Sequence, residues 1–192
     1  IAGAVLLLGP DVDLGARDLS GLDARGRDLS RAALAGAQTD SATKLTGLTG
    51  DAAPASLPTA QHVFLEGGAQ RLVAGPNVDL SGASDLSGLA FGAIDLAGAT
   101  LPAGYELRGG VLLGPGLVLP DLAGAALSLA GLNLAGADLS ATTNFAGLTT
   151  DGVHKTSGLP TLPVGVTAVD QEGGDTVALV AEGAVFSHGF AK

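Results

Sequence analysis

The chain has 192 residues, a length typical of a single domain, and its 9 Lys and Arg against 19 Asp and Glu give a formal net charge of −10. An acidic surface repels phosphates, so direct binding to nucleic acid is disfavoured. The chain has no Cys for disulfides or thiolate metal ligands, and with only 3 % aromatic residues its core must consist of Leu, Val and Ala.

The N-terminal segment, residues 1–8, is apolar and is predicted to form a β-strand. Its longest apolar run, Ala4 to Leu8, is far shorter than the ~20 residues that cross a bilayer, so no membrane span is predicted.

From residue 9 to residue 163 the sequence repeats with a period of five. A step of five rotates an α-helix by about 140° net and would scatter the repeated side chains around it. In a flat strand the same step would place them on alternate faces. We therefore predict an all-β fold in which each five-residue segment is one side of a square coil. The side chains of this core ladder should face inward: Leu14, Leu19, Leu29, Leu34, Leu86, Phe91, Leu96, Leu101, Leu119, Leu129, Leu134 and Leu139.

The residue before each ladder position is often acidic or Asn, as in Ala137-Asp138-Leu139-Ser140. Side chains alternate along an extended segment, so this residue should point outward. We therefore expect rows of acidic side chains on the outer faces, with one neutral Asn among them: Asp13, Asp18, Asp28, Asp85, Asp95, Asn133 and Asp138.

This five-residue pattern resembles the A-(D/N)-L-x-x repeat of the pentapeptide-repeat proteins, over roughly residues 9 to 148. The resemblance implies a right-handed quadrilateral β-helix, or solenoid. Arg17 and Arg27 depart from the pattern, because they stand where the family has a small inward residue. Burying an unpaired guanidinium is costly, so we predict that both side chains leave the interior at corners.

Two hairpins are predicted between the repeat runs, near residues 57–74 and 101–113. In the first, Gln61–Leu65 and Gln70–Val73 flank the turn Gly67-Gly68. In the second, Tyr105–Leu107 and Val111–Leu113 flank Gly109-Gly110. A Gly-Pro pair precedes each Leu run, at Gly9, Gly75 and Gly114, which indicates a modular tandem array.

Residues 164–192 lose the period of five and are predicted to form a C-terminal hairpin with terminal strands. Its strands are Val166 to Val169 and Thr176 to Val180, and a short strand, Ala184 to Phe186, follows.

The sequence predicts a non-enzymatic protein without catalytic, cofactor or metal sites. Ser41 and Lys44 match the spacing S-x-x-K, but the companion motifs are missing. His62, His154 and His188 show no metal-ligand spacing and are expected to be solvated loop histidines. Asp11-Val12-Asp13 and Gly173-Gly174-Asp175 are incomplete calcium motifs, so weak Ca²⁺ binding along the acidic rows is the cation interaction left open.

A structural role is the first function hypothesis. A β-helix with open, apolar ends presents unpaired backbone groups, and head-to-tail contacts that do not close generate fibres. We therefore predict that the protein self-associates end to end into an extracellular or cell-surface filament or array. The residues predicted to take part are Ile1, Val5, Leu6, Leu7, Leu8, Val177, Leu179, Val185 and Phe186.

Two alternatives stay open. Some pentapeptide-repeat proteins mimic DNA in shape and charge and bind DNA gyrase, and the resemblance together with the net charge implies such a role in the cytoplasm. The other alternative is a general protein-interaction scaffold, since family members share the fold without sharing an activity.

Overall fold

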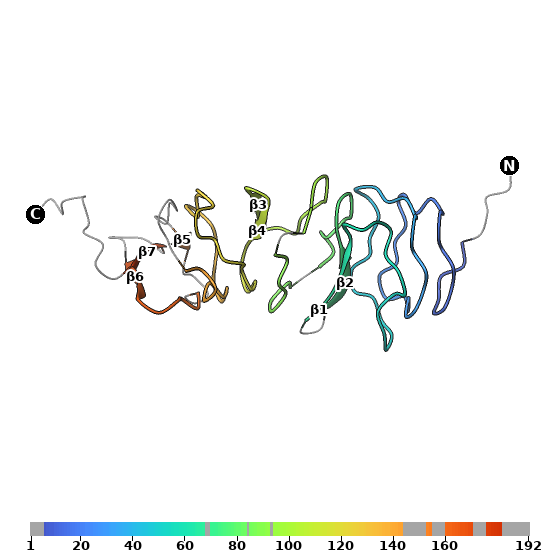
Figure 1. Cartoon of the computed structure of the whole chain (residues 1–192), viewed down its shortest axis with the longest axis horizontal. Coiled ribbons are helices and arrows are strands. Elements are labelled where there is room, and N and C mark those ends of the chain that lie inside the picture. The colour runs from blue at the N-terminus through green and yellow to red at the C-terminus, as the bar shows by residue number, and fades with distance from the viewer. Residues whose placement is uncertain are drawn as a thin grey trace, which may run out of the picture.

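The computed structural model describes residues 6–67, 70–83, 85–92, 94–143, 153–154, 160–170 and 176–181. These residues form an elongated body, and the chain advances along its long axis in sequence order (Figure 1). Strands, bridges and turns make up the regular structure of these ranges, which confirms the all-β prediction. Nowhere in the described ranges is there a helix with the length and apolar character that crossing a bilayer requires.

The described ranges contain seven short strands, and all of the pairings between these strands are antiparallel. Strand β1 (Val63–Gly67) pairs with β2 (Gln70–Ala74), and β3 (Glu106–Arg108) pairs with β4 (Val111–Leu113). The third sheet has the order β5-β7-β6, made of β5 (Val153–His154), β6 (Val166–Asp170) and β7 (Thr176–Ala181).

Hairpins therefore lie where the sequence predicts them, with small differences at their ends. The first predicted turn is shifted, because Gly67 belongs to β1 and pairs with Gln70. Strand β1 begins at Val63 rather than Gln61, because the His62 N–H donates to the Thr59 carbonyl at 3.1 Å and closes a turn. Similarly, the Tyr105 N–H donates to the Pro102 carbonyl at 3.3 Å, and β3 starts one residue later.

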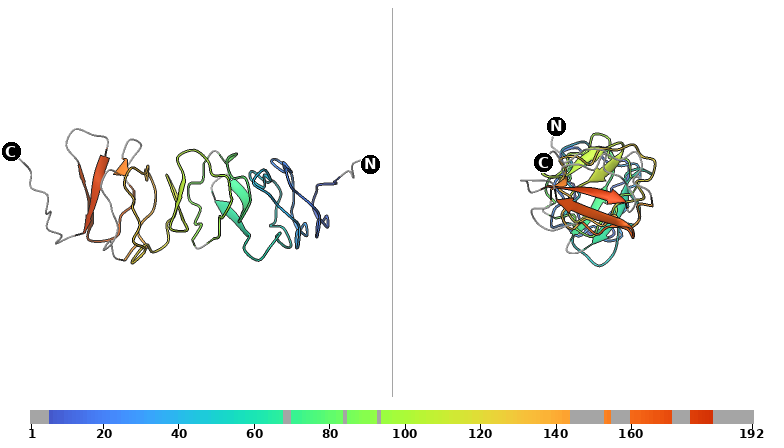
Figure 2. Two further views of the ribbon diagram at one scale, coloured as in Figure 1. Left: turned by 90° about the horizontal axis from the view of Figure 1, so that it is seen from above. Right: turned by 90° about the vertical axis from the view of Figure 1, so that its left-hand side faces the viewer.

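The hairpins alternate along the body with three stretches of repeated turns, called segment I (9–58), segment II (75–102) and segment III (114–143). Strands β6 and β7 lie across the C-terminal end of the body (Figure 2). In β2, Leu72 and Val73 are fully buried. The Val73 N–H donates to the Leu45 carbonyl and the Leu48 N–H to the Arg71 carbonyl, each at 2.9 Å. Strand β2 therefore packs directly onto segment I.

Within and beyond the segments, isolated parallel bridges join residues 20 to 23 positions apart in the sequence. The Leu14 N–H, for example, donates to the Ala33 carbonyl at 2.7 Å, and the Leu119 N–H to the Asp138 carbonyl at 2.9 Å. Successive lengths of chain are thus hydrogen-bonded side by side. The bridges are Asp13↔Ala33, Asp18↔Gln38, Asp23↔Lys44, Asp28↔Thr49, Ala33↔Ser56, Asp79↔Thr100, Val118↔Asp138 and Asp138↔Thr161.

A tight turn follows many ladder residues and explains the glycine in the repeat. The carbonyl of Leu19 accepts a hydrogen bond from the Leu22 N–H at 2.9 Å, and Gly21 between them has a φ of 71°. A positive φ at the third residue is the signature of a type II turn, which favours glycine there. Ala16 and Arg31 occupy the same turn position with φ of 56° and 58°.

Substitutions at this turn position should change stability through the backbone alone. A Cβ at Gly21 would meet no atom within 4 Å, so Gly21→Ala is expected to lower the free energy of unfolding by about 1 kcal/mol through left-handed strain. Ala16→Gly should raise it by a similar amount, because it removes the same strain. Urea unfolding followed by circular dichroism measures both variants. An unchanged Gly21→Ala variant would contradict the left-handed backbone at this turn.

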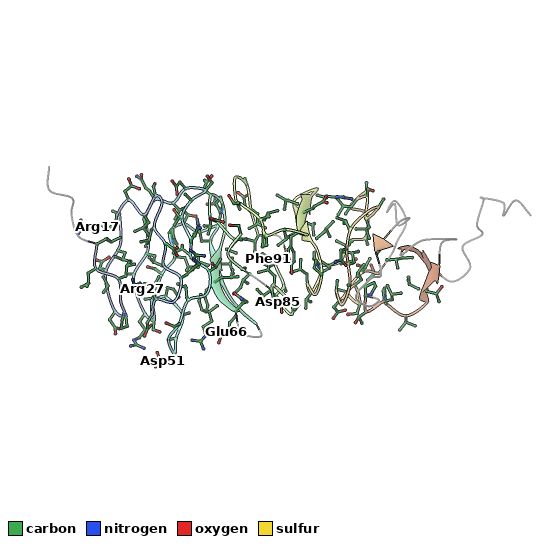
Figure 3. The ribbon with its side chains drawn as sticks, turned by 180° about the vertical axis from the view of Figure 1, so that it is seen from behind. Arg17, Arg27, Asp51, Glu66, Asp85 and Phe91 are labelled. Carbon is green, nitrogen blue, oxygen red and sulfur yellow. The ribbon has the colours of Figure 1, made fainter. Side chains whose placement is uncertain are left out.

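The core contains the predicted ladder, with one exception. Every ladder residue is buried except Leu101, which is half-buried and packs against the edge of the core. Leu101 is the last ladder residue of segment II and precedes the exposed turn at Ala103 and Gly104, so it is covered on one side only. The side chains of Arg17 and Arg27 are exposed, as predicted, and both are labelled in Figure 3.

The two predicted terminal features differ in their outcome. Residues 1–5 lie outside the described range, and Leu6–Leu8 form no strand, because no described residue pairs with them as a neighbouring strand. At the other end, β6 and β7 form a hairpin across the body, at the position predicted for the C-terminal hairpin (Figure 2).

Candidate functional site

The predicted self-association residues divide into exposed, buried and undescribed groups. Leu7 is 71 % exposed, while Leu6 and Leu8 are half-buried and pack against the core. Leu179 was predicted to be a contact residue, but this is wrong: β7 places it in the core at 4 % exposure. The side chains of Val177, Ile1, Val5, Val185 and Phe186 lie outside the described residues. The apolar edge formed by Leu6, Leu7 and Leu8 is therefore the candidate site.

The sequence around this apolar edge recurs twice inside the chain. Residues 6–14 align with residues 72–80 and 111–119 on their Gly-Pro pairs. The residue after each proline has positive φ: 59° at Asp11, 56° at Asn77 and 71° at Gly116. Each of these three residues donates its N–H to a carbonyl 19 or 20 residues later in the sequence. The acceptors are Ser30 for Asp11, Ala97 for Asn77 and Ala135 for Gly116. The alignment is therefore a structural equivalence.

Leu7 differs from its equivalents in burial. In this alignment Leu7 corresponds to Val73 in β2 and Leu112 in β4, which are 0 % and 2 % exposed against 71 % for Leu7. Both internal residues belong to the second strand of a hairpin. Val73 pairs with Phe64, and Leu112 pairs with Leu107. A first strand of this kind is missing beside Leu6–Leu8 in the described part of the chain.

The acidic rows have a structural function in the repeat. The Oδ1 atom of an outward Asp accepts a hydrogen bond from the N–H two residues later, as in Asp18 to Ser20 (3.0 Å) and Asp138 to Ser140 (2.9 Å). Such Asx-type bonds fix the entry to a turn. The side chain and backbone of the following Ser lower the pKa of each carboxyl group. The same Asp-to-Ser arrangement lowers the pKa of Asp18, Asp28, Asp85 and Asp138.

Arginine side chains neutralise part of the acidic surface at segment I. Arg31 Nε donates to Asp11 Oδ1 at 2.9 Å, and its Nη1 lies 3.3 Å from Asp51 Oδ1. Arg25 Nε donates to Asp23 Oδ1 at 2.9 Å. Hydrogen bonds from the Arg25 side chain and backbone lower the Asp23 pKa to about 2.

Acid should therefore weaken the fold. The Asp23 pKa is about 2 in the folded protein against an ordinary value of 3.8, so the unfolded chain binds more protons between these values. The stabilisation is complete above pH 3.8 and is lost as the pH falls towards 2. Urea unfolding compared at about pH 5 and about pH 2.5 should show lower stability in acid. Asp23→Asn should reduce this difference, and an equal loss in this variant would argue against the contribution of Asp23.

Lys44, which stands in the S-x-x-K spacing with Ser41, contacts an acidic residue of segment II. The Lys44 ammonium group points to Asp79, with Nζ 3.6 Å from Oδ2. Asp79 is 6 % exposed, unlike the other acidic residues of the repeats, and its N–H donates to the Thr43 carbonyl at 2.8 Å. This pair and this bond join segments I and II.

His62 is not the solvated loop histidine that the sequence suggested. It is 4 % exposed, its Nδ1 is hydrogen-bonded to Thr59 Oγ1 at 2.7 Å, and burial lowers its pKa. A Cβ at Gly75 would lie 2.7 Å from the His62 ring, which leaves room there only for glycine. In the next hairpin Tyr105 covers Gly114 in the same way. Each ring thus fills the place of the missing side chain opposite it.

Sequence reasoning missed this pairing of rings with glycines, although one signal was present. Antiparallel register extends from Val63↔Ala74 to His62 and Gly75, and from Glu106↔Leu113 to Tyr105 and Gly114. Counting outward from the Gly109-Gly110 turn would have placed Tyr105 beside Gly114. In the first hairpin Gly67 belongs to β1 and pairs with Gln70, so counting from Gly67-Gly68 would have placed His62 opposite Val73 rather than Gly75. The side chains of His154 and His188 lie outside the described residues.

The remaining surface shows no built cation site. Among the described residues no group of three or more His, Asp or Glu side chains could hold a metal ion. An open hollow on the surface is lined by Asp23, Arg25, Gly26 and Arg27. The Asp23 carboxylate in this hollow is already paired with the Arg25 guanidinium. Comparison of the chain with protein-family models, with curated proteins and with solved structures finds no match.

Proposed function

We propose that the chain is a right-handed quadrilateral β-helix of the pentapeptide-repeat type that acts as a non-enzymatic structural subunit. In this proposal it self-associates through the apolar edge of Leu6, Leu7 and Leu8 into an extracellular or cell-surface filament or array.

The spacing of the bridges supports the β-helical part of the proposal. Four sides of five residues make a turn of 20, and the bridges join residues 20 to 23 apart. The turns that close after Leu14, Leu19, Ala24, Leu29 and Leu34 recur every five residues, as four corners per coil require.

The functional part of the proposal, self-association, rests on the exposure of Leu7. Burying a leucine side chain contributes about 1.5–3 kcal/mol, and the equivalents Val73 and Leu112 gain it inside the body. Leu7 alone of the three remains 71 % exposed. An apolar edge whose internal copies are all covered by a neighbouring strand is suited to bind such a strand from a second molecule.

Replacing Leu7 by Asp tests the proposal. The wild-type protein should form oligomers or filaments whose mass rises with concentration, and Leu7→Asp should abolish them, because a charge cannot be buried without a partner. Analytical ultracentrifugation and electron microscopy measure the change. Leu107→Asp is the matched control. Leu107 is an apolar residue of β3, on the side of the body, and it is 39 % exposed.

Two results would oppose this function. A wild-type protein that stays monomeric at all concentrations would remove the self-association. Equal loss of assembly in Leu7→Asp and Leu107→Asp would show that the apolar edge has no special part in it.

The surface at segment I supports the DNA-mimic alternative less well. A mimic that binds DNA gyrase needs uninterrupted rows of negative charge, whereas Arg25 and Arg31 pair with three of the carboxylates there. A supercoiling assay with gyrase would reveal inhibition or protection if the alternative held.

A further inference from the structure

We infer that the apolar edge of one copy binds hairpin β6–β7 of a second copy, so that the subunits associate head to tail. This inference rests on the proposed self-association and names the partner surface.

The internal order of the body provides the template for the contact. Strand β2 ends at Ala74 and leads through Gly75-Pro76 into segment II, and β4 ends at Leu113 and leads through Gly114-Pro115 into segment III. Each of these segments therefore begins against a hairpin. Segment I begins in the same way at Gly9-Pro10, but no hairpin of the described chain lies beside it.

Hairpin β6–β7 is the one hairpin not followed by a segment in the described part of the chain. It lies across the C-terminal end of the body (Figure 2). Strand β6 is the edge of the sheet, and among the described strands it pairs with β7 alone. Thr167 in β6 is exposed, and Val164 just before it is fully exposed, at 104 %.

The edge of β6 suits the addition of a strand. An edge strand presents a row of unpaired backbone N–H and C=O groups, and an extended segment can pair with it. Leu6–Leu8 can supply such a segment, since the equivalent residues of β2 and β4 are strands paired within hairpins. Val164 and Leu7 would then lose their exposure in the same contact.

Two variants, each blocking one end, test the inference. Leu7→Asp blocks the apolar edge, and Thr167→Lys blocks β6 by placing a charge on its exposed edge. Each variant alone should be monomeric in sedimentation velocity. An equimolar mixture should give a heterodimer that grows no further, because one functional edge and one functional hairpin remain. Thr161→Lys, at an exposed position outside the hairpin, is the matched control and should assemble like the wild type.

Each result separates the inference from the proposed function. If Thr167→Lys assembles like the wild type while Leu7→Asp does not, the hairpin is not the partner, and self-association through the apolar edge stands. If the wild type itself is monomeric, both fail. Should Thr167→Lys lose its circular dichroism spectrum, Val164→Lys in the fully exposed turn replaces it with the same expected result.

Discussion

Replacing Leu34 by Ala should lower the free energy of unfolding by about 2–5 kcal/mol, one of the two largest effects expected in this protein. Leu34 is fully buried in the core, and its N–H donates to Ser56 Oγ at 3.0 Å, which holds it against the next turn of chain. The substitution removes three carbon atoms and leaves a cavity between turns that are already fixed by backbone bonds. Thermal unfolding followed by circular dichroism should show a midpoint lowered by roughly 5–15 °C.

Leu101→Ala is the matched control for Leu34→Ala. It deletes the same atoms from the half-buried ladder position, where solvent already covers one side. We expect a loss below about 2 kcal/mol, since less apolar area leaves the core. Equal losses at both positions would contradict the difference in their burial.

Adding a methyl group at Gly114 should destabilise the second hairpin by about 3 kcal/mol, through overpacking and loss of hydrogen bonds. A Cβ there would lie 2.8 Å from Cε1 and 2.9 Å from Cγ of Tyr105. The ring cannot move aside freely, because its hydroxyl donates to the Pro115 carbonyl at 3.1 Å and accepts from the Leu86 N–H at 3.3 Å. Urea unfolding of Gly114→Ala measures the loss.

A double-mutant cycle tests whether the ring causes the loss at Gly114. In a Tyr105→Ala background, Gly114→Ala should cost less than about 1 kcal/mol, because the atoms that the methyl group meets are gone. If Gly114→Ala costs the same with and without the ring, the contact with Tyr105 does not determine its effect.

The core was predictable from the sequence because one rule governs it. A period of five fits neither a helix nor a flat strand, so the period alone assigns Leu14, Leu29 and Leu134 to an interior, and all three are buried. The hairpins were predictable for a similar reason, since Gly-Gly pairs between apolar stretches indicate tight turns.

The features that escaped prediction depend on neighbours distant in the sequence. Asp79 occupies the outward position of its repeat, yet Lys44 and Thr43 of segment I cover it. His62 is polar and near a proline, which suggests a loop, but antiparallel register places it over Gly75. Leu179 is apolar near one end, which suggested a contact surface, but β7 turns it towards the core. A period in the sequence defines which face a residue occupies, and not what lies against that face.

The bridges between residues 20 to 23 apart also bear on how the protein would respond to mechanical load. If tension were applied between its two ends, the hydrogen bonds that join successive lengths of chain would be pulled open one after another rather than sheared together. Every length released, about 20 residues, would extend by up to about 70 Å. An assembly of such subunits would therefore yield in steps and dissipate work before its chains became taut.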